Sequence, residues 1–182
     1  MKILRVYITG FMGSGKSTLA PIIANTIGWN SIDLDDEIVK STGMKIPRIF
    51  KERGEEYFRT LETQILIECS QKDNVVVSLG GGTIARQENF DKIKETGILI
   101  YLRSSPEKIL LRLKNKTDRP LFQTFDKVNL SEEESLLKIK KLLKEREKFY
   151  KIADLTFDID GITVGKTVDQ IVRVLKKKYL LS

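Results

Sequence analysis

Short runs of apolar, mostly β-branched residues alternate along the chain with longer amphipathic stretches. The short runs predict five strands, at 3–9, 31–34, 75–79, 98–102 and 155–159. Such runs are typical of strands in a parallel sheet that helices cover on both faces. The amphipathic stretches predict helices at 16–27, 36–42, 46–52, 55–71, 88–95, 106–115, 131–150 and 167–179. We therefore expect a single doubly wound α/β domain, with its ligands at the carboxyl ends of the strands.

Several predicted helix ends carry residues that favour starting or stopping a helix. Gly28 follows the first helix as a C-terminal stop, and Ser105 precedes Pro106 at the start of a later one. Ser131 and Glu134 have the spacing of a capping box. These signals support the predicted boundaries.

A glycine-rich loop follows the first strand directly and opens the first helix. Residues 10–17 read Gly-Phe-Met-Gly-Ser-Gly-Lys-Ser, which matches the phosphate-binding pattern G-x-x-x-x-G-K-[ST]. The glycines let backbone N–H groups turn toward phosphate oxygens at the positive end of the helix. We expect Lys16 to reach the terminal phosphates, without a role in the core, and the Ser17 hydroxyl to hold Mg²⁺. A flexible turn without a ligand is the competing interpretation.

Composition excludes several classes of protein. The chain has 182 residues, of which 41% are hydrophobic, and this suits one domain with a sizeable core. No apolar run approaches the ~18 residues that span a membrane, and no signal-peptide pattern is present, so we expect a cytoplasmic protein. Because the chain contains no histidine, a general base must be a carboxylate, and the usual transition-metal sites are not expected. Cys69 stands alone, which favours a buried helical thiol over a disulfide.

The net charge of +7 has two interpretations. It suits a nucleic-acid surface, or an enzyme that handles anions such as ATP and a carboxylated metabolite. Lysines crowd the stretches 138–151 and 176–178 without interleaved pairs of aromatic residues. This pattern favours solvated helix faces over a nucleic-acid platform.

Acidic residues follow the second predicted strand, in Ile32-Asp33-Leu34-Asp35-Asp36-Glu37. Strand alternation places Asp33 and Asp35 on the same side of the sheet, at the carboxyl end of the strand. One carboxylate can then hold a Mg²⁺-bound water, while the other accepts a proton from a substrate hydroxyl. The alternative is that Asp35 or Asp36 only caps the helix that begins near Glu37.

Three consecutive glycines, at 80–82, follow the third strand, where they form either a close approach to a ligand or a plain loop. Arginines also occupy apolar helix faces. Arg59 lies beside Phe58, and Arg146 lies on the apolar face of the 131–150 helix formed by Leu136, Ile139, Leu143 and Tyr150. An arginine on a buried face needs an anion, and two in one cleft suit a planar carboxylate. For Arg59, an intrahelical pair with Glu62 is the alternative.

The segment between the helices at 106–115 and 131–150 is polar, basic and poorly periodic. We expect it to form a lid, in which Arg112 and Arg119 move over the nucleotide phosphates and exclude water. A plain exposed loop is the alternative.

Seven stretches of the chain, in order, match one known pattern at its spacing. They are GFMGSGKST, IDLDDEI, TGMKIPRIFKERGEEYFRTLE, SLGGGT, KTDRPL, EREKFYKIAD and FDID. Over nearly the whole chain they resemble the shikimate kinase family. The resemblance implies the P-loop kinase fold of the nucleoside monophosphate kinases: three α/β/α layers and a five-stranded parallel sheet of order 2-3-1-4-5. It also implies transfer of phosphate from ATP, with Mg²⁺, to the 3-hydroxyl of shikimate, on the route to chorismate and the aromatic amino acids.

The resemblance also implies roles for individual residues. The implied catalytic residues are Lys16, Asp35 and Arg119, and Asp35 contacts the substrate hydroxyl. The nucleotide-binding residues are Gly13, Ser14, Gly15, Lys16, Ser17, Thr18, Arg112, beside the adenine, and Arg119, in the lid. The shikimate-binding residues are Asp35, Phe50, Phe58, Arg59, Gly80, Gly81, Gly82 and Arg146. Ser17 binds the metal, and Asp33 supports it through water.

Within this group, Arg59 and Arg146 clamp the substrate carboxylate, and Gly81 offers its N–H at the same site. Phe50 and Phe58 pack against the apolar face of the ring. The resemblance further implies a substrate-binding insert at about 36–64 and a lid at about 114–127. It implies a monomer that binds shikimate, with no nucleic-acid or membrane partner.

The chain departs from the family pattern at two places. Pro21 cannot donate to the Ser17 carbonyl, so we expect a kink in the first helix near the phosphate loop. The loop at 160–163 has no arginine-proline pair, which leaves the adenine contacts there unassigned. The alternatives are a related small-molecule kinase of the gluconate type, a non-catalytic ATP-binding protein and a nucleic-acid-binding ATPase.

Overall fold

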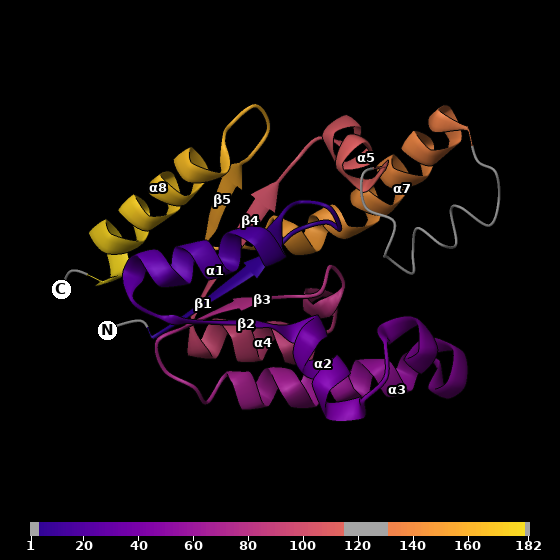
Figure 1. Ribbon diagram of the computed structural model, residues 1–182, viewed down its shortest axis with the longest axis horizontal. Coiled ribbons are helices and arrows are strands. Elements are labelled where there is room, and N and C mark those ends of the chain that lie inside the picture. The colour runs from indigo at the N-terminus through magenta and orange to yellow at the C-terminus, as the bar shows by residue number, and fades with distance from the viewer. Residues whose placement is uncertain (1–3, 115–130, 181–182) are drawn as a thin grey trace.

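A central parallel sheet organises the computed structural model, which describes residues 4–114 and 131–180 (Figure 1). The five strands stand in the order β2-β3-β1-β4-β5, and all neighbours are parallel. They span Arg5–Thr9 (β1), Asn30–Asp33 (β2), Val75–Ser78 (β3), Ile98–Arg103 (β4) and Leu155–Asp158 (β5). The predicted fold class and strand order are therefore confirmed.

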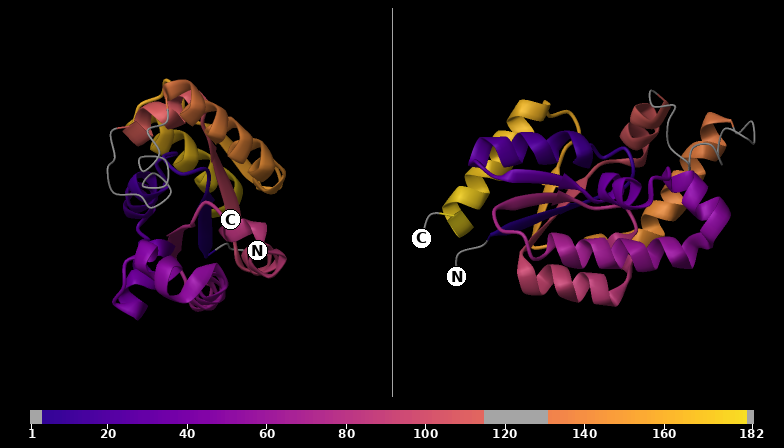
Figure 2. Two further views of the ribbon diagram at one scale, coloured as in Figure 1. Left: turned by 90° about the vertical axis from the view of Figure 1, so that its right-hand side faces the viewer. Right: turned by 60° about the horizontal axis from the view of Figure 1, so that its bottom comes forward.

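Helices cover both faces of the sheet, which gives three layers (Figure 2). The α-helices are Lys16–Ile27 (α1), Leu34–Thr42 (α2), Ile46–Cys69 (α3), Gln87–Thr96 (α4), Pro106–Lys114 (α5), Glu132–Tyr150 (α7) and Val164–Leu175 (α8). A short 3₁₀-helix, Thr83–Ala85 (η1), and a short π-helix, Lys176–Leu180 (η2), complete the described elements. None of the helices in the described ranges is long and apolar enough to cross a membrane.

Strand alternation divides the apolar residues between two buried clusters. Val6 and Ile8 of β1 pack in the cluster that contains α1 and α8. Tyr7, between them, packs in the cluster that contains residues of α3, α4 and α7. Because successive side chains of a strand point to opposite faces, one short apolar run contributes to both clusters.

Helix α1 matches its predicted range and continues through Pro21. Its backbone remains helical from Lys16 to Ile27, through Pro21, and Gly28 ends it in the left-handed conformation. The helix is therefore not interrupted at Pro21, and the kink near the phosphate loop stays a prediction. Ser17 and Pro21 are both exposed, so water can take the place of the hydrogen bond that proline cannot donate.

Two other helices differ from the prediction in instructive ways. The stretches predicted at 46–52 and 55–71 form one element, α3, whose backbone leaves the helical region only at Gly54 (φ 83°, ψ 171°). Helix α2 begins at Leu34, two residues earlier than predicted, because Asp33 caps it by accepting a hydrogen bond from the Asp35 N–H. The assumption that the strand continues to Asp35 is therefore wrong.

Candidate active site

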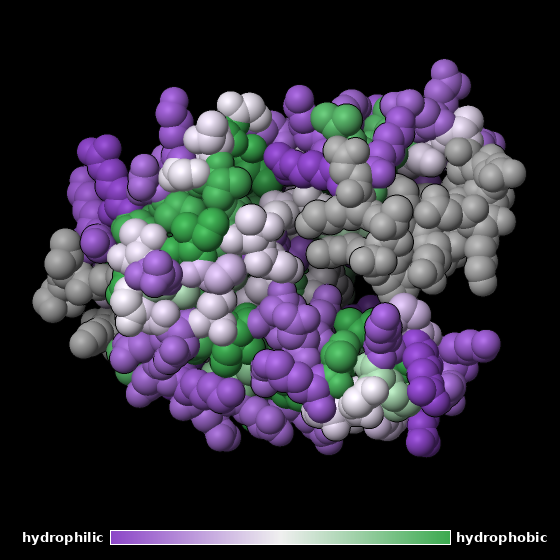
Figure 3. All heavy atoms as spheres, in the orientation of Figure 1, coloured by the Kyte–Doolittle hydropathy of each residue, from purple (hydrophilic) through white to green (hydrophobic). Residues whose placement is uncertain are grey.

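The segments that follow the strands meet at the carboxyl ends of the sheet, next to α2 and α5 in Figure 1. The surface in Figure 3 is hollowed at this end, above α2 and α3. The phosphate loop follows β1, Asp33 ends β2, and Gly80–Gly82 follow β3. The motifs singled out in the sequence are thus brought to one edge of the sheet.

The phosphate loop needs glycine for its backbone and for its packing. Gly10, Gly13 and Gly15 have φ values of 154°, 77° and 86°. A Cβ atom at Gly10 would lie 2.6 Å from Ser14 Oγ and 2.8 Å from the Leu102 carbonyl, which leaves no room for a side chain. The N–H groups of Gly13 and Gly15 donate to no other residue in the described ranges. Free N–H groups before a helix N-terminus suit a bound phosphate.

Lys16 is buried, with 6% of its surface exposed. Its ammonium group donates hydrogen bonds to the carbonyls of Gly10, at 2.8 Å, and Phe11, at 3.1 Å. The expectation that Lys16 has no role in the core is therefore wrong, because it also holds the phosphate loop together. The neighbouring residues differ in exposure: Ser14 is buried, whereas Ser17 and Thr18 are exposed at the start of α1.

A cavity of about 250 Å³ lies beside the start of α1. Its lining includes Ser17, Asp33 and Ser78, so the structure brings the two candidate metal residues to one space. A hydroxyl and a carboxylate are oxygen ligands of the kind Mg²⁺ prefers, and Mg²⁺ usually keeps several waters and binds substrate phosphates. The described residues contain no cluster of three acidic, cysteine or histidine ligands. These residues therefore fit Mg²⁺.

Asp35 faces the glycine loop from the first turn of α2. Its Oδ1 atom is 3.3 Å from the position that a Cβ atom of Gly80 would occupy, and Glu62 Oε1 is 2.9 Å from the same point. Any side chain at residue 80 would displace one of these carboxylates. Gly80 thus allows two acidic side chains to lie directly against the loop.

Arg59 forms the intrahelical pair that the sequence left open, and it also reaches the loop. Its Nη1 atom lies 2.9 Å from Glu62 Oε2, and Glu62, 1% exposed, also accepts a 2.6 Å hydrogen bond from the Thr83 hydroxyl. The Arg59 guanidinium lies 3.1 Å from the Cβ position of Gly82. Glu62 therefore holds Arg59 against the glycine loop, so the two interpretations of Arg59 are compatible.

Arg146 approaches the same loop from α7. Its Nη1 atom is 3.2 Å from the Cβ position of Gly81, and its guanidinium lies 5.6 Å from the centre of the Phe11 ring. Among the described residues, no carboxylate is within ion-pair distance of Arg146, and nothing accepts the N–H groups of Gly81 and Gly82. Cationic groups and N–H donors converge here, which suits a bound carboxylate.

Comparison with known proteins identifies the family. Residues 12–176 match the family model of shikimate kinase. A shikimate kinase of Chlorobium limicola is 45% identical over 93% of this chain and 85% of its own. The chain belongs to the shikimate kinase family.

Solved structures agree with the shikimate kinase assignment. The shikimate kinase from Acinetobacter baumannii, in complex with shikimate, has a TM-score of 0.86 and 32% identity, covering 97% of this chain and 95% of its own. A gluconokinase from Sinorhizobium meliloti 1021 reaches a TM-score of only 0.60 at 17% identity, over 95% of this chain and 91% of its own. The latter likeness shows the shared fold alone.

Two aromatic rings predicted for the shikimate kinase site pack against each other, and one of them lies next to Arg59. The rings of Phe50 and Phe58 are 4.6 Å apart between centroids and tilted by 37°. Phe58 is buried and Phe50 is exposed, and the Arg59 guanidinium lies 5.1 Å from the Phe58 ring. The break at Gly54 lets the two halves of α3 bring these rings together.

Arg112 connects the ends of β4 and β5. It belongs to α5 and donates hydrogen bonds to the Ser104 hydroxyl, at 3.1 Å, and the Ile159 carbonyl, at 3.5 Å. It also lies 3.7 Å from Asp160. Burial alone would raise the pKa of Asp160, but hydrogen bonds from Ser104 and Ser105 and the charge of Arg112 lower it below its ordinary value. Arg112 therefore lies beside the 160–163 loop, and movement of Arg112 with a lid stays a prediction.

A larger cavity, of about 420 Å³, lies beside this junction, between α7 and the ends of β4 and β5. Its lining includes Tyr101, Ser104, Lys144 and Asp160 but no residue of the phosphate loop or the glycine loop. Arg119 lies outside the described residues, as does all of the predicted lid except Lys114.

Several residues that hold the glycine loop in place were not identified from the sequence. Asn89 of α4 donates a 3.0 Å hydrogen bond to the Thr83 carbonyl, and Tyr150 of α7 donates a 2.9 Å hydrogen bond to the Gly81 carbonyl. Thr83, directly after the three glycines, joins the network through Glu62. The sequence offers only one local signal for two of them. Glu62 follows Arg59 by three residues and Tyr150 follows Arg146 by four, so each lies on the same helix face as a candidate site arginine.

Proposed function

We propose that the protein transfers the γ-phosphoryl group of ATP to the 3-hydroxyl of shikimate and forms shikimate 3-phosphate. This reaction serves the synthesis of chorismate and the aromatic amino acids. Membership of the shikimate kinase family supports it, as does the high coverage of the relatives. Within this chain, the observation that carries the proposal is the convergence of Arg59 and Arg146 on Gly81 and Gly82.

Shikimate kinases use ATP with Mg²⁺, and the phosphate loop is the place for the nucleotide. In our proposal, the N–H groups of Gly13 and Gly15, together with Ser14 and Thr18, surround the phosphates. Lys16 exchanges its carbonyl partners for phosphate oxygens. Ser17 and, through water, Asp33 hold Mg²⁺, which when bound neutralises charge on the phosphates.

Asp35 orients the 3-hydroxyl of shikimate and accepts its proton in this proposal. The hydroxyl oxygen forms a bond to the γ-phosphorus as the bond from phosphorus to the β-phosphate oxygen breaks. Because phosphoryl transfer depends mainly on positioning and charge, the role of Asp35 includes the direction of the hydroxyl as well as its proton. Arg119 supplies further positive charge from the predicted lid at about 114–127.

The opposite end of shikimate is fixed by the carboxylate clamp. Arg59 and Arg146 bind the carboxylate, with the N–H of Gly81 and its neighbours Gly80 and Gly82 close to it. The rings of Phe50 and Phe58 pack against the apolar side of the substrate. Both residues belong to the predicted insert at about 36–64. Arg112 lies on the adenine side. Two anchors, at the carboxylate and at the hydroxyl, hold the substrate in line with the phosphate.

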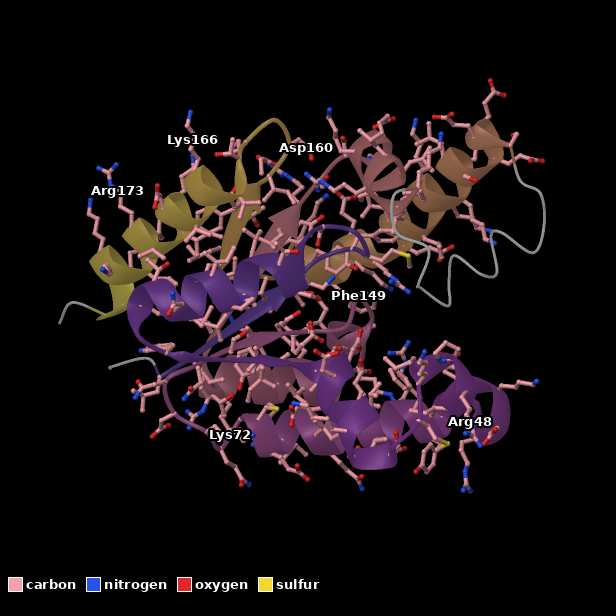
Figure 4. The ribbon with its side chains drawn as sticks, in the orientation of Figure 1. Arg48, Lys72, Phe149, Asp160, Lys166 and Arg173 are labelled. Atoms are coloured by element: carbon pink, nitrogen blue, oxygen red, sulfur yellow. The ribbon has the colours of Figure 1, made fainter. Side chains whose placement is uncertain are left out.

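We also propose that the protein works as a monomer in the cytoplasm, without a nucleic-acid or membrane partner. Lys166 and Arg173, on α8, point away from the body of the molecule (Figure 4). Basic residues of this kind form a solvated face, and ATP and shikimate account for the anions that a basic protein binds.

The clamp is tested by Arg146→Ala, because Arg146 has no acidic partner among the described residues. Loss of a charge-assisted contact in a closed site typically costs about 2–5 kcal/mol, so the Kd for shikimate should rise at least about 30-fold. The Kd for ATP should stay within about threefold, since only the clamp is lost. Calorimetric titration measures both.

Arg48→Ala is the matched control. Arg48 lies on α3, is exposed, and pairs only with Glu52 among the described residues. In Figure 4 it lies on the outer side of the molecule. We expect its removal to leave both affinities unchanged. Equal loss of shikimate and ATP binding in Arg146→Ala would assign Arg146 a structural role instead.

A further inference from the structure

Tyr150, the last residue of α7, is fully buried among apolar side chains yet keeps a polar contact. Its hydroxyl donates a hydrogen bond of 2.9 Å to the Gly81 carbonyl. The Tyr101 ring stacks on it, with centroids 4.8 Å apart and planes 18° apart. Burial of a hydroxyl is costly without a partner, and this partner belongs to the loop that the two arginines face.

The hydrogen bond restrains one peptide group of the glycine loop. The described chain has no cis peptide, and in a planar trans peptide the Gly82 N–H points opposite to the Gly81 carbonyl. Glycines have no side chain to limit rotation of the peptide planes beside them. A bond to the Gly81 carbonyl therefore also sets the direction of the Gly82 N–H, which no described residue accepts.

Arg146 and Tyr150 bind the loop from one face of α7. They are four residues apart, so they lie about one helical turn from each other. Arg146 Nη1 lies 3.2 Å from the Cβ position of Gly81, and the Tyr150 hydroxyl bonds to the carbonyl of the same glycine. The position of α7 thus fixes both a cationic group and a peptide group at one point of the site.

We infer that Tyr150 is a positioning residue for the carboxylate end of the substrate. Its hydroxyl holds the Gly81–Gly82 peptide so that the Gly82 N–H, like the Arg146 guanidinium, is directed at the bound carboxylate. The inference rests on the proposed function, because it places the shikimate carboxylate between Arg59 and Arg146.

Tyr150 keeps its proton throughout the neutral range. Burial raises the pKa of its phenol above the ordinary value, although the neighbouring charge of Arg146 acts in the opposite direction. A protonated phenol can donate to a carbonyl, whereas a phenolate cannot. The phenol can therefore donate to the Gly81 carbonyl across the neutral pH range.

Tyr150→Phe tests the inference, with Tyr7→Phe as the matched control. Each substitution removes one fully buried phenol hydroxyl from the same apolar cluster. Tyr7 shares a hydrogen bond of 2.8 Å with Thr96, away from the glycine loop. The two variants should therefore lose similar stability in thermal unfolding, and only one should change the site.

Steady-state kinetics with shikimate and ATP varied separately provide the decisive readout. We expect Tyr150→Phe to raise the KM for shikimate about 3- to 10-fold, the range of one hydrogen bond. Its kcat and its KM for ATP should stay within about twofold, because an interaction remote from the transferred group acts equally in ground and transition states. Tyr7→Phe should leave all three parameters unchanged.

Failure of the Tyr150 inference and failure of the proposed function give different results. An unchanged KM for shikimate in Tyr150→Phe, or the same rise in Tyr7→Phe, would overturn the inference while leaving the proposed function intact. An unaltered protein that does not phosphorylate shikimate would overturn the proposed function, and the inference with it.

Discussion

Asp33 and Asp35 are two residues apart, yet they belong to different elements and face different spaces. Asp33 ends β2, caps α2 and lines the cavity beside Ser17. Asp35 lies in the first turn of α2, with its carboxylate against Gly80. One residue therefore lies toward the proposed metal and the other toward the proposed substrate hydroxyl.

These positions predict different responses to loss of charge. Asp35→Asn should lower kcat by a factor of about 100 or more, because loss of a positioned general base typically costs 10²–10⁴. The KM for shikimate should stay within about tenfold, since the clamp is intact. Initial rates at saturating ATP and shikimate, measured over a series of Mg²⁺ concentrations, check this. Near-normal kcat in Asp35→Asn would exclude both its orienting and its proton-accepting role.

Asp33→Asn is the comparison for the same experiment. Asparagine caps helices about as well as aspartate, so α2 should keep its start while the site loses one negative charge. We expect the rate of this variant to recover as Mg²⁺ is raised, because weaker metal binding is offset by concentration. Recovery of Asp35→Asn with Mg²⁺, or its absence in Asp33→Asn, would contradict the assignment of the two acids.

Among the elements, α3 has a break that depends on a single residue, Gly54. Gly54 has φ 83° and ψ 171°, a conformation that is essentially restricted to glycine. No atom lies within 4 Å of a Cβ built there, so the cost of a side chain is backbone strain alone. Gly54→Ala should therefore lower the free energy of unfolding by about 1–3 kcal/mol, measured by urea denaturation.

Gly165→Ala is the control for α3. Gly165 lies in α8, has open space around its Cβ position and does not have a positive φ. Alanine there should leave stability unchanged or raise it by up to about 1 kcal/mol. Equal stability of Gly54→Ala and the unaltered protein would show that the two halves of α3 do not need this break.

The elements that the sequence predicted well are those with local signals. Each predicted strand lies within two residues of an observed one, because apolar β-branched runs end at polar residues or glycine. The break at residue 54 was also local, since glycine itself marks it. The start of α2 was missed because a single hydrogen bond, from the Asp35 N–H to the Asp33 side chain, decides it.

The site residues that the sequence missed depend on partners far along the chain. Tyr150 was counted only as part of an apolar stripe, because its hydroxyl bonds to a loop 69 residues away. Glu62 was weighed only as a neighbour of Arg59, since its contact with Thr83 joins residues 21 apart. A periodic pattern identifies the face of a helix but not the partner of a polar atom on it.

At the scale of the whole molecule, the absence of histidine shapes the dependence of stability on pH. Hydrogen bonds and charge from Arg103 lower the pKa of Asp158, and the pKa of Asp160 is also lowered. A lowered carboxyl pKa stabilises the fold above the unfolded pKa, and this stability is lost as pH falls through the folded pKa. We expect the free energy of unfolding to be flat from about pH 6 to 8 and to fall below about pH 4.

Cys69 contributes to the alkaline limit together with the buried tyrosines, because burial raises the pKa of its thiol from 9.0 to about 11. A raised folded pKa gives stability that is complete below the unfolded pKa and lost as pH rises through the folded pKa. Two pKa units correspond to about 2–3 kcal/mol, lost between about pH 9 and 11. Urea unfolding over this range should show a smaller pH slope for Cys69→Ala. An equal slope in both proteins would contradict this origin of the alkaline loss.

The central claim, transfer of phosphate from ATP to shikimate, is tested most directly by ADP release from the purified protein. The assay contains ATP and Mg²⁺, with shikimate, with gluconate or with neither. We predict steady release of ADP with shikimate and only background release in the other two. Equal release without shikimate, or faster release with gluconate, would contradict the assignment of Arg59, Arg146 and the glycine loop to the shikimate carboxylate.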